Sequence, residues 1–158
     1  MLQKQAADEQ ERIAAQFIRN QGGEERVATL RHEMNKIMEE ATGIYRDGKT
    51  LEAAIPQIAA VKERFRNVAL DDRTLSFNTE LISAIELEFM LEVAEAGIHS
   101  AFQRRESRGS HQRTDFPKRD DQNFLKHSMA YRTDGVPRIG YKDVVITRWP
   151  PAERVYGK

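Results

Sequence analysis

Apolar residues recur at intervals of three or four positions through the first two thirds of the chain. This spacing is typical of one face of an α-helix. A first helix carries Ile13 and Phe17 on that face. We expect it to stop at 21–23, because glycine readily takes the left-handed backbone of a helix end. A second helix is predicted from Val27 to about Thr42.

A third helix is predicted to begin at Thr50, whose hydroxyl suits the N-cap position, and to bury an apolar face that starts at Leu51. Pro56 interrupts this pattern, because proline in a helix interior removes a backbone hydrogen bond and clashes with the preceding turn. We therefore expect either a kink at Pro56 or a true helix start nearer Ala54.

The longest predicted helix begins at Asn78 or Thr79 and runs to about Arg105. It is apolar on two faces, so we expect neighbours on both of these sides and the remaining polar face in water. The first apolar stripe is Ala84, Leu87, Leu91, Ala94, Ile98 and Ala101, the second is Ile82, Ile85, Phe89, Val93 and Ala96, and the polar stripe is Glu88, Glu92, Glu95 and His99.

The pattern changes beyond this helix. Residues 106–123 are polar and irregular. A weakly alternating stretch at 125–131 predicts a strand, and 139–147 predicts a second strand after the turn signal at 133–135. Consecutive prolines at 150–151 end the second strand, because proline cannot pair inside a sheet.

These patterns predict a mainly α fold, with a bundle of three to four helices and a long central helix at about 79–105. We divide the chain into a helical bundle at 1–105 and a basic irregular tail with a small antiparallel β-hairpin at 106–158. An isolated two-stranded hairpin is marginally stable in water. The tail is therefore expected to pack on the bundle or on a partner.

The formal net charge of zero conceals an acidic part and a basic part. Residues 1–103 contain 12 Lys and Arg against 18 Asp and Glu, which gives −6. Residues 104–158 contain 13 against 7, which gives +6. Either the two parts neutralise each other where they touch, or the basic part faces a separate acidic partner.

Composition excludes several kinds of site. The chain has no cysteine, which removes disulfides, thiolate metal sites and cysteine nucleophiles. No apolar run approaches the roughly 20 residues that span a bilayer, and the first residues lack a signal-peptide core. Any membrane association is therefore expected through partner subunits. No Gly-x-Gly-x-x-Gly follows a predicted strand, so no dinucleotide-binding site is encoded.

The polar stripe of the longest helix is the best metal candidate. Carboxylate-bridged metal bundles use Glu-x-x-His on two helices, with further glutamates on the others. Here Glu95 and His99 are four positions apart, and no second such motif exists. A solvated face with a Glu–His pair is the plainer interpretation. A self-sufficient metal protein that uses Glu92, Glu95 and His99 remains the alternative function.

The densest polar stretch is 104–121, with six Lys and Arg and four acids. It suits a network of Arg–carboxylate pairs that fixes an irregular loop, or a subunit interface, where arginine is enriched. A nucleic-acid patch is disfavoured, because the interleaved acids offset phosphate-seeking charges. We expect no nucleic-acid partner. The residues assigned to loop fixing or to an interface are Arg105, Glu106, Arg108, His111, Arg113 and Arg119.

This same stretch resembles the C-terminal region of the fumarate reductase and succinate dehydrogenase flavoproteins. The Glu-Ser-Arg-Gly-x-His core at 106–111 is specific to that superfamily. The residues at 43–46 and the Pro-Pro-Ala-Glu-Arg-Val-Tyr-Gly ending at 150–157 favour the fumarate reductase version. Further matches lie at 38–40, 77–81, 115–117, 119–121 and 123–128.

The resemblance implies a longer subunit, in which an FAD-binding domain and a capping domain precede this segment and carry the chemistry. No residue here matches the flavin-binding or dicarboxylate-binding positions, so we assign no catalytic, cofactor-binding or metal residue. The segment alone is expected to be inactive and to hold no cofactor. It is expected to support the flavin domain and to contact the iron–sulfur subunit, at the cytoplasmic face of the cell membrane.

Overall fold

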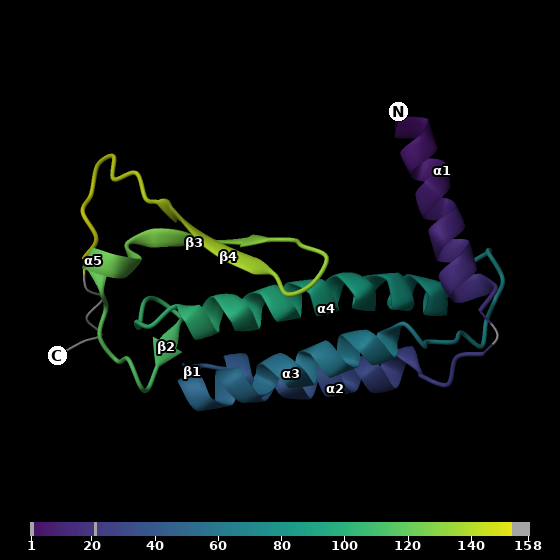
Figure 1. Cartoon of the computed structure of the whole chain (residues 1–158), viewed down its shortest axis with the longest axis horizontal. Coiled ribbons are helices and arrows are strands. Elements are labelled where there is room, and N and C mark those ends of the chain that lie inside the picture. Colours follow the sequence, from purple (N-terminus) through teal and green to yellow (C-terminus); the bar gives the residue numbers. More distant parts are fainter. Residues whose placement is uncertain (1, 21, 153–158) are drawn as a thin grey trace.

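The structure is a computed structural model that describes residues 2–20 and 22–152. Three helices lie lengthwise against one another, which confirms the predicted bundle and its long helix (Figure 1). A small hairpin lies over one end of the longest helix, and the first helix projects from the other end. The elements are α1 (Leu2–Ile13), η1 (Ala14–Ile18), α2 (Val27–Thr42), β1 (Tyr45–Arg46), α3 (Gly48–Phe65), α4 (Thr79–Gln103), β2 (Gln112–Arg113), α5 (Asp121–Phe124), β3 (Lys126–Tyr131) and β4 (Arg138–Asp143).

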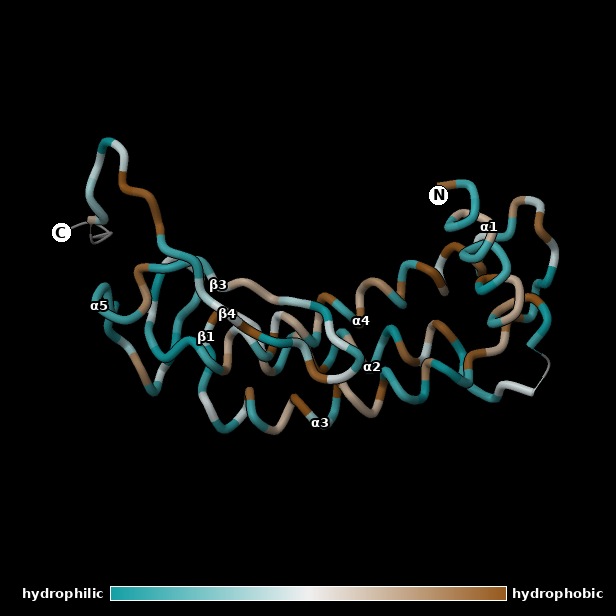
Figure 2. The backbone as a smooth tube through the Cα atoms, turned by 45° about the horizontal axis from the view of Figure 1, so that its top comes forward, coloured by the Kyte–Doolittle hydropathy of each residue, from teal (hydrophilic) through white to brown (hydrophobic). Residues whose placement is uncertain are grey.

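The core lies where α2, α3 and α4 meet, and apolar segments recur along these helices in the trace of Figure 2. Leu30, Ile58 and Leu87 are fully buried there. Phe17 joins them from η1, a single π-helical turn, and its ring meets Phe65 edge to face at 5.9 Å between centroids. The spacing of apolar residues alone therefore identified the inward faces of α2 and α3 and the first apolar stripe of α4.

The start of α3 differs from the prediction. Asp47, and not Thr50, is the N-cap, because the Asp47 carboxylate accepts the Thr50 backbone N–H at 2.9 Å. The helix also runs unbroken from Gly48 through Pro56, so a start nearer Ala54 is wrong. Pro56 lies on the exposed face, where water can reach the carbonyl left without an N–H donor.

The faces of α4 are used in an unexpected way. Its first apolar stripe is buried, but Ile82, Phe89 and Val93 of the second stripe are 56%, 60% and 71% exposed. In the polar stripe, by contrast, Glu95 and His99 are buried. The prediction of neighbours on both apolar sides is therefore wrong for the described part of the chain. Burial of Glu95 is tolerated because Lys62 of α3 supplies a counter-charge to it.

The predicted antiparallel hairpin is confirmed, with β3 paired to β4 from Lys126–Asp143 to Tyr131–Arg138. The second strand ends at Asp143 and not at Thr147, and Val145 beyond it is 80% exposed. Both strands contact α4. The division of the chain at 105/106 stays a prediction, and residues 153–157 of the proline-rich ending lie outside the described residues.

A short parallel pairing was not predicted from the sequence. β1, between α2 and α3, pairs with β2 in the irregular segment, with Tyr45 opposite Gln112 and Arg46 opposite Arg113. The pairing holds the loop that follows α4 against the loop that precedes α3. It therefore brings together the charged residues described next.

Candidate functional site

A fully buried carboxylate, that of Glu106, lies at the centre of the segment that follows α4. Arg108 donates to it twice, at 2.9 and 3.0 Å, and the Asp120 backbone N–H donates at 2.8 Å. The Arg104 guanidinium completes the set. A buried charge is tolerable only when opposite charges and donors surround it, and Glu106 meets this condition.

Arg113 closes the C-terminal end of α4. Its side chain is 2% exposed and donates to the carbonyls of Ala101 at 2.9 Å and Phe102 at 3.2 Å. These carbonyls belong to the last turn, which has no further N–H partners and carries the negative end of the helix dipole. A buried guanidinium is suited to this position because it is positively charged and offers several donors.

Asp115 couples this helix end to the start of α3. Arg113 grips its carboxylate with two bonds of 2.7 Å, and the Gly48 backbone N–H donates to it at 2.9 Å. The hydrogen bonds from Arg113 lower the pKa of Asp115 to about 2. The carboxylate therefore stays ionised at neutral pH and binds both helix ends.

Arg104 ties the hairpin to the same cluster. Its guanidinium donates to the Phe124 carbonyl at 2.9 Å, to the Ser128 hydroxyl at 3.2 Å and to the Lys126 carbonyl. One arginine thus joins Glu106, the end of α5 and the beginning of β3. Because all these acceptors belong to this chain, Arg104 acts as an internal clasp.

His111 lies between two elements and is half buried. Arg46 of β1 lies 3.0 Å from its Nδ1, and the Arg104 carbonyl lies 3.1 Å from its Nε2. A guanidinium can only donate, so Nδ1 accepts and Nε2–H donates, which fixes the neutral tautomer. Burial lowers the pKa of His111, and the neighbouring arginines act in the same direction.

The six residues selected from the sequence separate into two groups. Glu106, Arg108, His111 and Arg113 lie together, and Arg119 pairs with Asp121 at 2.9 Å at the edge of the cluster. Arg105 is exposed, and no carboxylate of the described residues lies within ion-pair distance of it. The site also uses Arg104, Ser107 and Asp115, which lie in the charged stretch 104–121 predicted to form Arg–carboxylate pairs, and Arg46, which was not predicted.

The charge asymmetry is not relieved by direct pairing between the two parts of the chain. Within residues 2–20 and 22–152, every ion pair joins either two residues of the acidic part or two residues of the basic part. On the hairpin, Arg132 and Lys142 are exposed and have no carboxylate partner among the described residues. The hydrogen bond from Arg12 lowers the pKa of the Glu9 carboxylate of α1, and Arg132 lies near enough for its charge to add to this effect, so Lys142 is the more available of the two cations.

The metal candidates do not converge. Glu92 and Glu95 both bind Lys62, at 3.0 Å for Glu92, so their carboxylates are already engaged by a cation of the chain. His99 is buried beside them, with its Nε2 unpaired. Across the described ranges, no three His, Asp or Glu residues are placed to hold a metal ion. We therefore set the metal-binding alternative aside.

The arrangement is suited to holding a shape. Arg104, Arg108, Arg113 and Arg119 all have their guanidinium groups directed at acceptors of the chain itself. Such saturated groups offer little to an incoming phosphate or substrate. Within the described ranges, no helix combines the length and apolar character required to cross a membrane.

Replacing the central carboxylate tests the importance of this cluster. Glu106→Gln removes the charge and turns an amide donor toward arginine donors, so it is expected to lower the free energy of unfolding by about 3–5 kcal/mol. Glu63→Gln is the matched control, because Glu63 pairs with Arg66 on the exposed surface. That change is expected to cost less than about 0.5 kcal/mol in urea unfolding. Equal effects of the two variants would contradict the assignment.

His111 predicts a pH dependence of stability. Its pKa is lower in the folded chain than its ordinary value of 6.5, so acid protonates the unfolded state first. The contribution of His111 is fully present above that value and declines as the pH falls through it, by up to about 1.4 kcal/mol per pH unit. His111→Gln keeps one donor and one acceptor but cannot titrate.

Urea unfolding at pH 8, 7, 6 and 5 would check this expectation. The decline in stability between pH 7 and pH 5 is expected to be shallower for His111→Gln than for the unchanged chain. The two are compared first at pH 8, where the imidazole is neutral in both states. Identical slopes for the two proteins would rule out a titrating role for His111.

Comparison with known proteins places this cluster in a family. The family model described as fumarate reductase flavoprotein C-term matches residues 31–156. The fumarate reductase flavoprotein subunit of Mycobacterium tuberculosis is 49% identical over 158 residues, which are 99% of this chain and 27% of that protein. A mitochondrial succinate dehydrogenase flavoprotein subunit of Oryza sativa is 36% identical over 88% of this chain and 23% of its own length.

A solved structure gives the same assignment. The quinol fumarate reductase of E. coli contains a segment that superposes with a TM-score of 0.90 at 46% identity, over 98% of this chain and 26% of that one. The chain thus spans about a quarter of the length of its relatives. The matched residues include the whole arginine–carboxylate cluster, which lies within 31–156. The chain belongs to the C-terminal family of the fumarate reductase and succinate dehydrogenase flavoprotein subunits.

Proposed function

We propose that this chain acts as the C-terminal support and docking segment of a flavoprotein subunit that interconverts fumarate and succinate, with fumarate reductase favoured. The observation that carries the proposal is the match of nearly the whole chain to one quarter of such a subunit, at a TM-score of 0.90. In this proposal the flavin-binding and capping portions of the longer subunit bind FAD and the dicarboxylate. The present segment holds its shape and position.

The tail is proposed to face the iron–sulfur subunit of the complex. Support comes from the exposed cations Arg105 and Lys142, which form no ion pair with a carboxylate of the described residues. Complementary charge on a partner speeds docking and fixes its orientation. Membrane attachment would then come only through the other subunits, with this segment on the cytoplasmic side.

A chimeric subunit tests the proposed function. The matching segment of the E. coli flavoprotein subunit is replaced by this chain and produced with the other subunits of that enzyme. We expect flavin absorbance and fumarate reduction, because the fold of the segment is shared. The 158-residue chain alone is expected to be colourless and inactive. The same chimera with Glu106→Gln is the control for a segment that has lost its shape.

Two results would contradict the proposal. One is a folded chimera that binds no flavin and turns over no fumarate. The other is tight FAD binding or dicarboxylate turnover by the 158-residue chain on its own. The first result would show that this segment cannot replace its counterpart in the flavoprotein subunit. The second would show that the segment itself carries the chemistry.

The docking role of the tail has a separate test. Reversing Arg108, Arg113 and Arg119 together would break internal pairs and unfold the loop, so it cannot isolate docking. Arg105→Glu with Lys142→Glu instead leaves those pairs intact. In the chimera it is expected to reduce retention of the iron–sulfur subunit about fivefold at low salt.

The matched control is Lys36→Glu on the exposed face of α2. It changes net charge in the same direction at a position far along the chain from the tail. Co-purification and flavin content are measured for each protein. Unchanged recovery of the iron–sulfur subunit with the double variant would remove the proposed role of the tail.

A further inference from the structure

An apolar ridge runs along the open side of α4. Ile82, Phe89 and Val93 repeat at helical spacing and are more than half exposed. They span about 16 Å at the rise of an α-helix. Phe77, just before the helix, is 101% exposed, and Leu75 beside it is 79% exposed. Exposed apolar side chains gathered in this way on one element mark an interaction site more often than scattered ones do.

The beginning of the ridge is held in a costly backbone conformation. Phe77 has a positive φ of 54°, which is unfavourable for a bulky residue. With Asn78 as N-cap, Phe77 and Ile82 occupy the two positions that commonly pack together as a hydrophobic staple. The full exposure of Phe77 shows that this contact is not made. The strained turn therefore directs an aromatic ring outward and leaves Ile82 uncovered.

The turn is fixed by a buried side chain. The Asn78 amide donates to the carbonyls of Asp72 at 2.8 Å and Thr74 at 2.9 Å, and its oxygen accepts the Leu81 N–H at 2.7 Å. Glu80 accepts the backbone N–H groups of Asp71 and Asp72 at 2.9 Å. The outward position of Phe77 is therefore built into the fold in advance of any partner.

The acidic side chains beside the ridge are all ion-paired, with Arg12 and Lys62 each shared between two carboxylates. Glu86 pairs with Arg31 at 3.3 Å, Glu88 with Arg12 at 2.9 Å, and Glu92 with Lys62 at 3.0 Å. An interface core is depleted of unpaired charge, because each buried ion without a partner is costly. The sides of the ridge thus meet the condition for burial against another protein surface.

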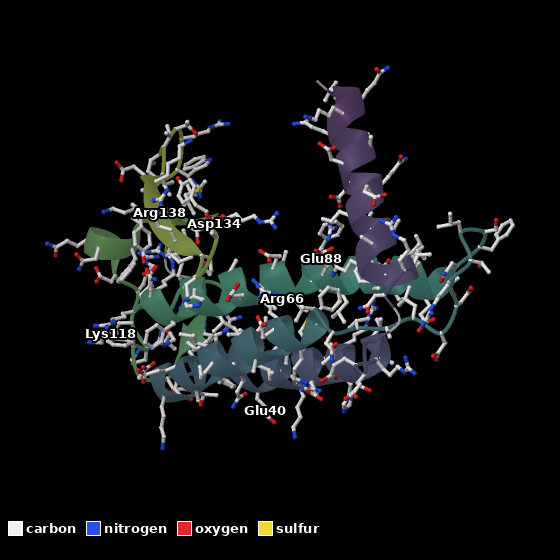
Figure 3. All side chains as sticks on the ribbon, turned by 45° about the vertical axis from the view of Figure 1, so that its right-hand side comes forward. Glu40, Arg66, Glu88, Lys118, Asp134 and Arg138 are labelled. Carbon is white, nitrogen blue, oxygen red and sulfur yellow. The ribbon has the colours of Figure 1, made fainter. Side chains whose placement is uncertain are left out.

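The position of the ridge indicates what covers it. The hairpin and α1 both project on the side of α4 that faces away from α2 and α3 (Figures 1 and 3). α1 has no buried residue and rises from the bundle on this same side. Polypeptide joined to the outer end of α1 would emerge over the open face of α4.

We infer that the ridge of Phe77, Ile82, Phe89 and Val93 is the surface on which the flavin-binding portion of the same subunit docks. The inference rests on the proposed function, since the relatives have roughly three quarters of their polypeptide outside the matched segment. That portion is the largest protein surface attached to this segment, and an apolar ridge whose flanking carboxylates are ion-paired fits a permanent contact of this kind.

Cysteine labelling provides the test, because the chain has no cysteine of its own. Val93→Cys is placed in the isolated chain and in the chimeric flavoprotein subunit without its other subunits. N-ethylmaleimide reacts with both, and peptide-resolved mass spectrometry gives the rate at this position. We expect labelling to be at least about tenfold slower in the flavin-loaded chimera. Glu40→Cys, on the outer face of α2 (Figure 3), is expected to react equally in both.

Each other outcome overturns the inference. If the chimera holds flavin and reduces fumarate while Cys at 93 stays reactive, the docking surface lies elsewhere and the proposed function stands. Protection that appears only when the other subunits are added assigns the ridge to one of them. Protection in the isolated chain that rises with its concentration assigns the ridge to a second copy. A chimera that binds no flavin would contradict both the proposed function and this inference.

Discussion

The C-terminal end of α4 is the point on which the rest of the structure depends. A helix that ends inside a protein leaves its last carbonyls without donors, and these must be satisfied. Arg113 does this from ten residues further along the chain, and Asp115 holds Arg113 in place while binding the start of α3. The need to satisfy these carbonyls brings the irregular segment back against the end of α4, and this contact orders the segment.

Glu106 extends the same principle to the hairpin. Its carboxylate binds Arg104 and Arg108, and Arg104 in turn donates to the carbonyls of Phe124, at the end of α5, and Lys126, at the beginning of β3. A two-stranded hairpin has little stability by itself. Here it is held by hydrogen bonds from an arginine that belongs to neither strand and by contact with α4.

The sequence predicted the features that local rules determine. Apolar spacing located the three main helices, and the Asn78 cap and the hairpin followed from short-range patterns. Asp47 was missed as a cap because Thr50 satisfies the same rule, and only geometry distinguishes them. The clustering of Arg46 with His111 could not be predicted, because 65 residues separate them and no periodic pattern connects them. The second apolar stripe and the polar stripe of α4 were assigned wrongly. Spacing shows whether a stripe is apolar or polar, but it does not show which part of a protein covers it.

The absence of ion pairs between the acidic and basic parts, within the described ranges, has a consequence for how the molecule responds to its medium. Dissolved ions weaken attraction between exposed charges over about 8–10 Å but hardly affect short hydrogen bonds inside a folded cluster. The contact between bundle and tail includes bonds of the second kind, such as the buried bond from Arg113 to the Ala101 carbonyl. Added salt would therefore weaken binding of the tail to any acidic partner at concentrations that leave the contact between the tail and its own bundle intact.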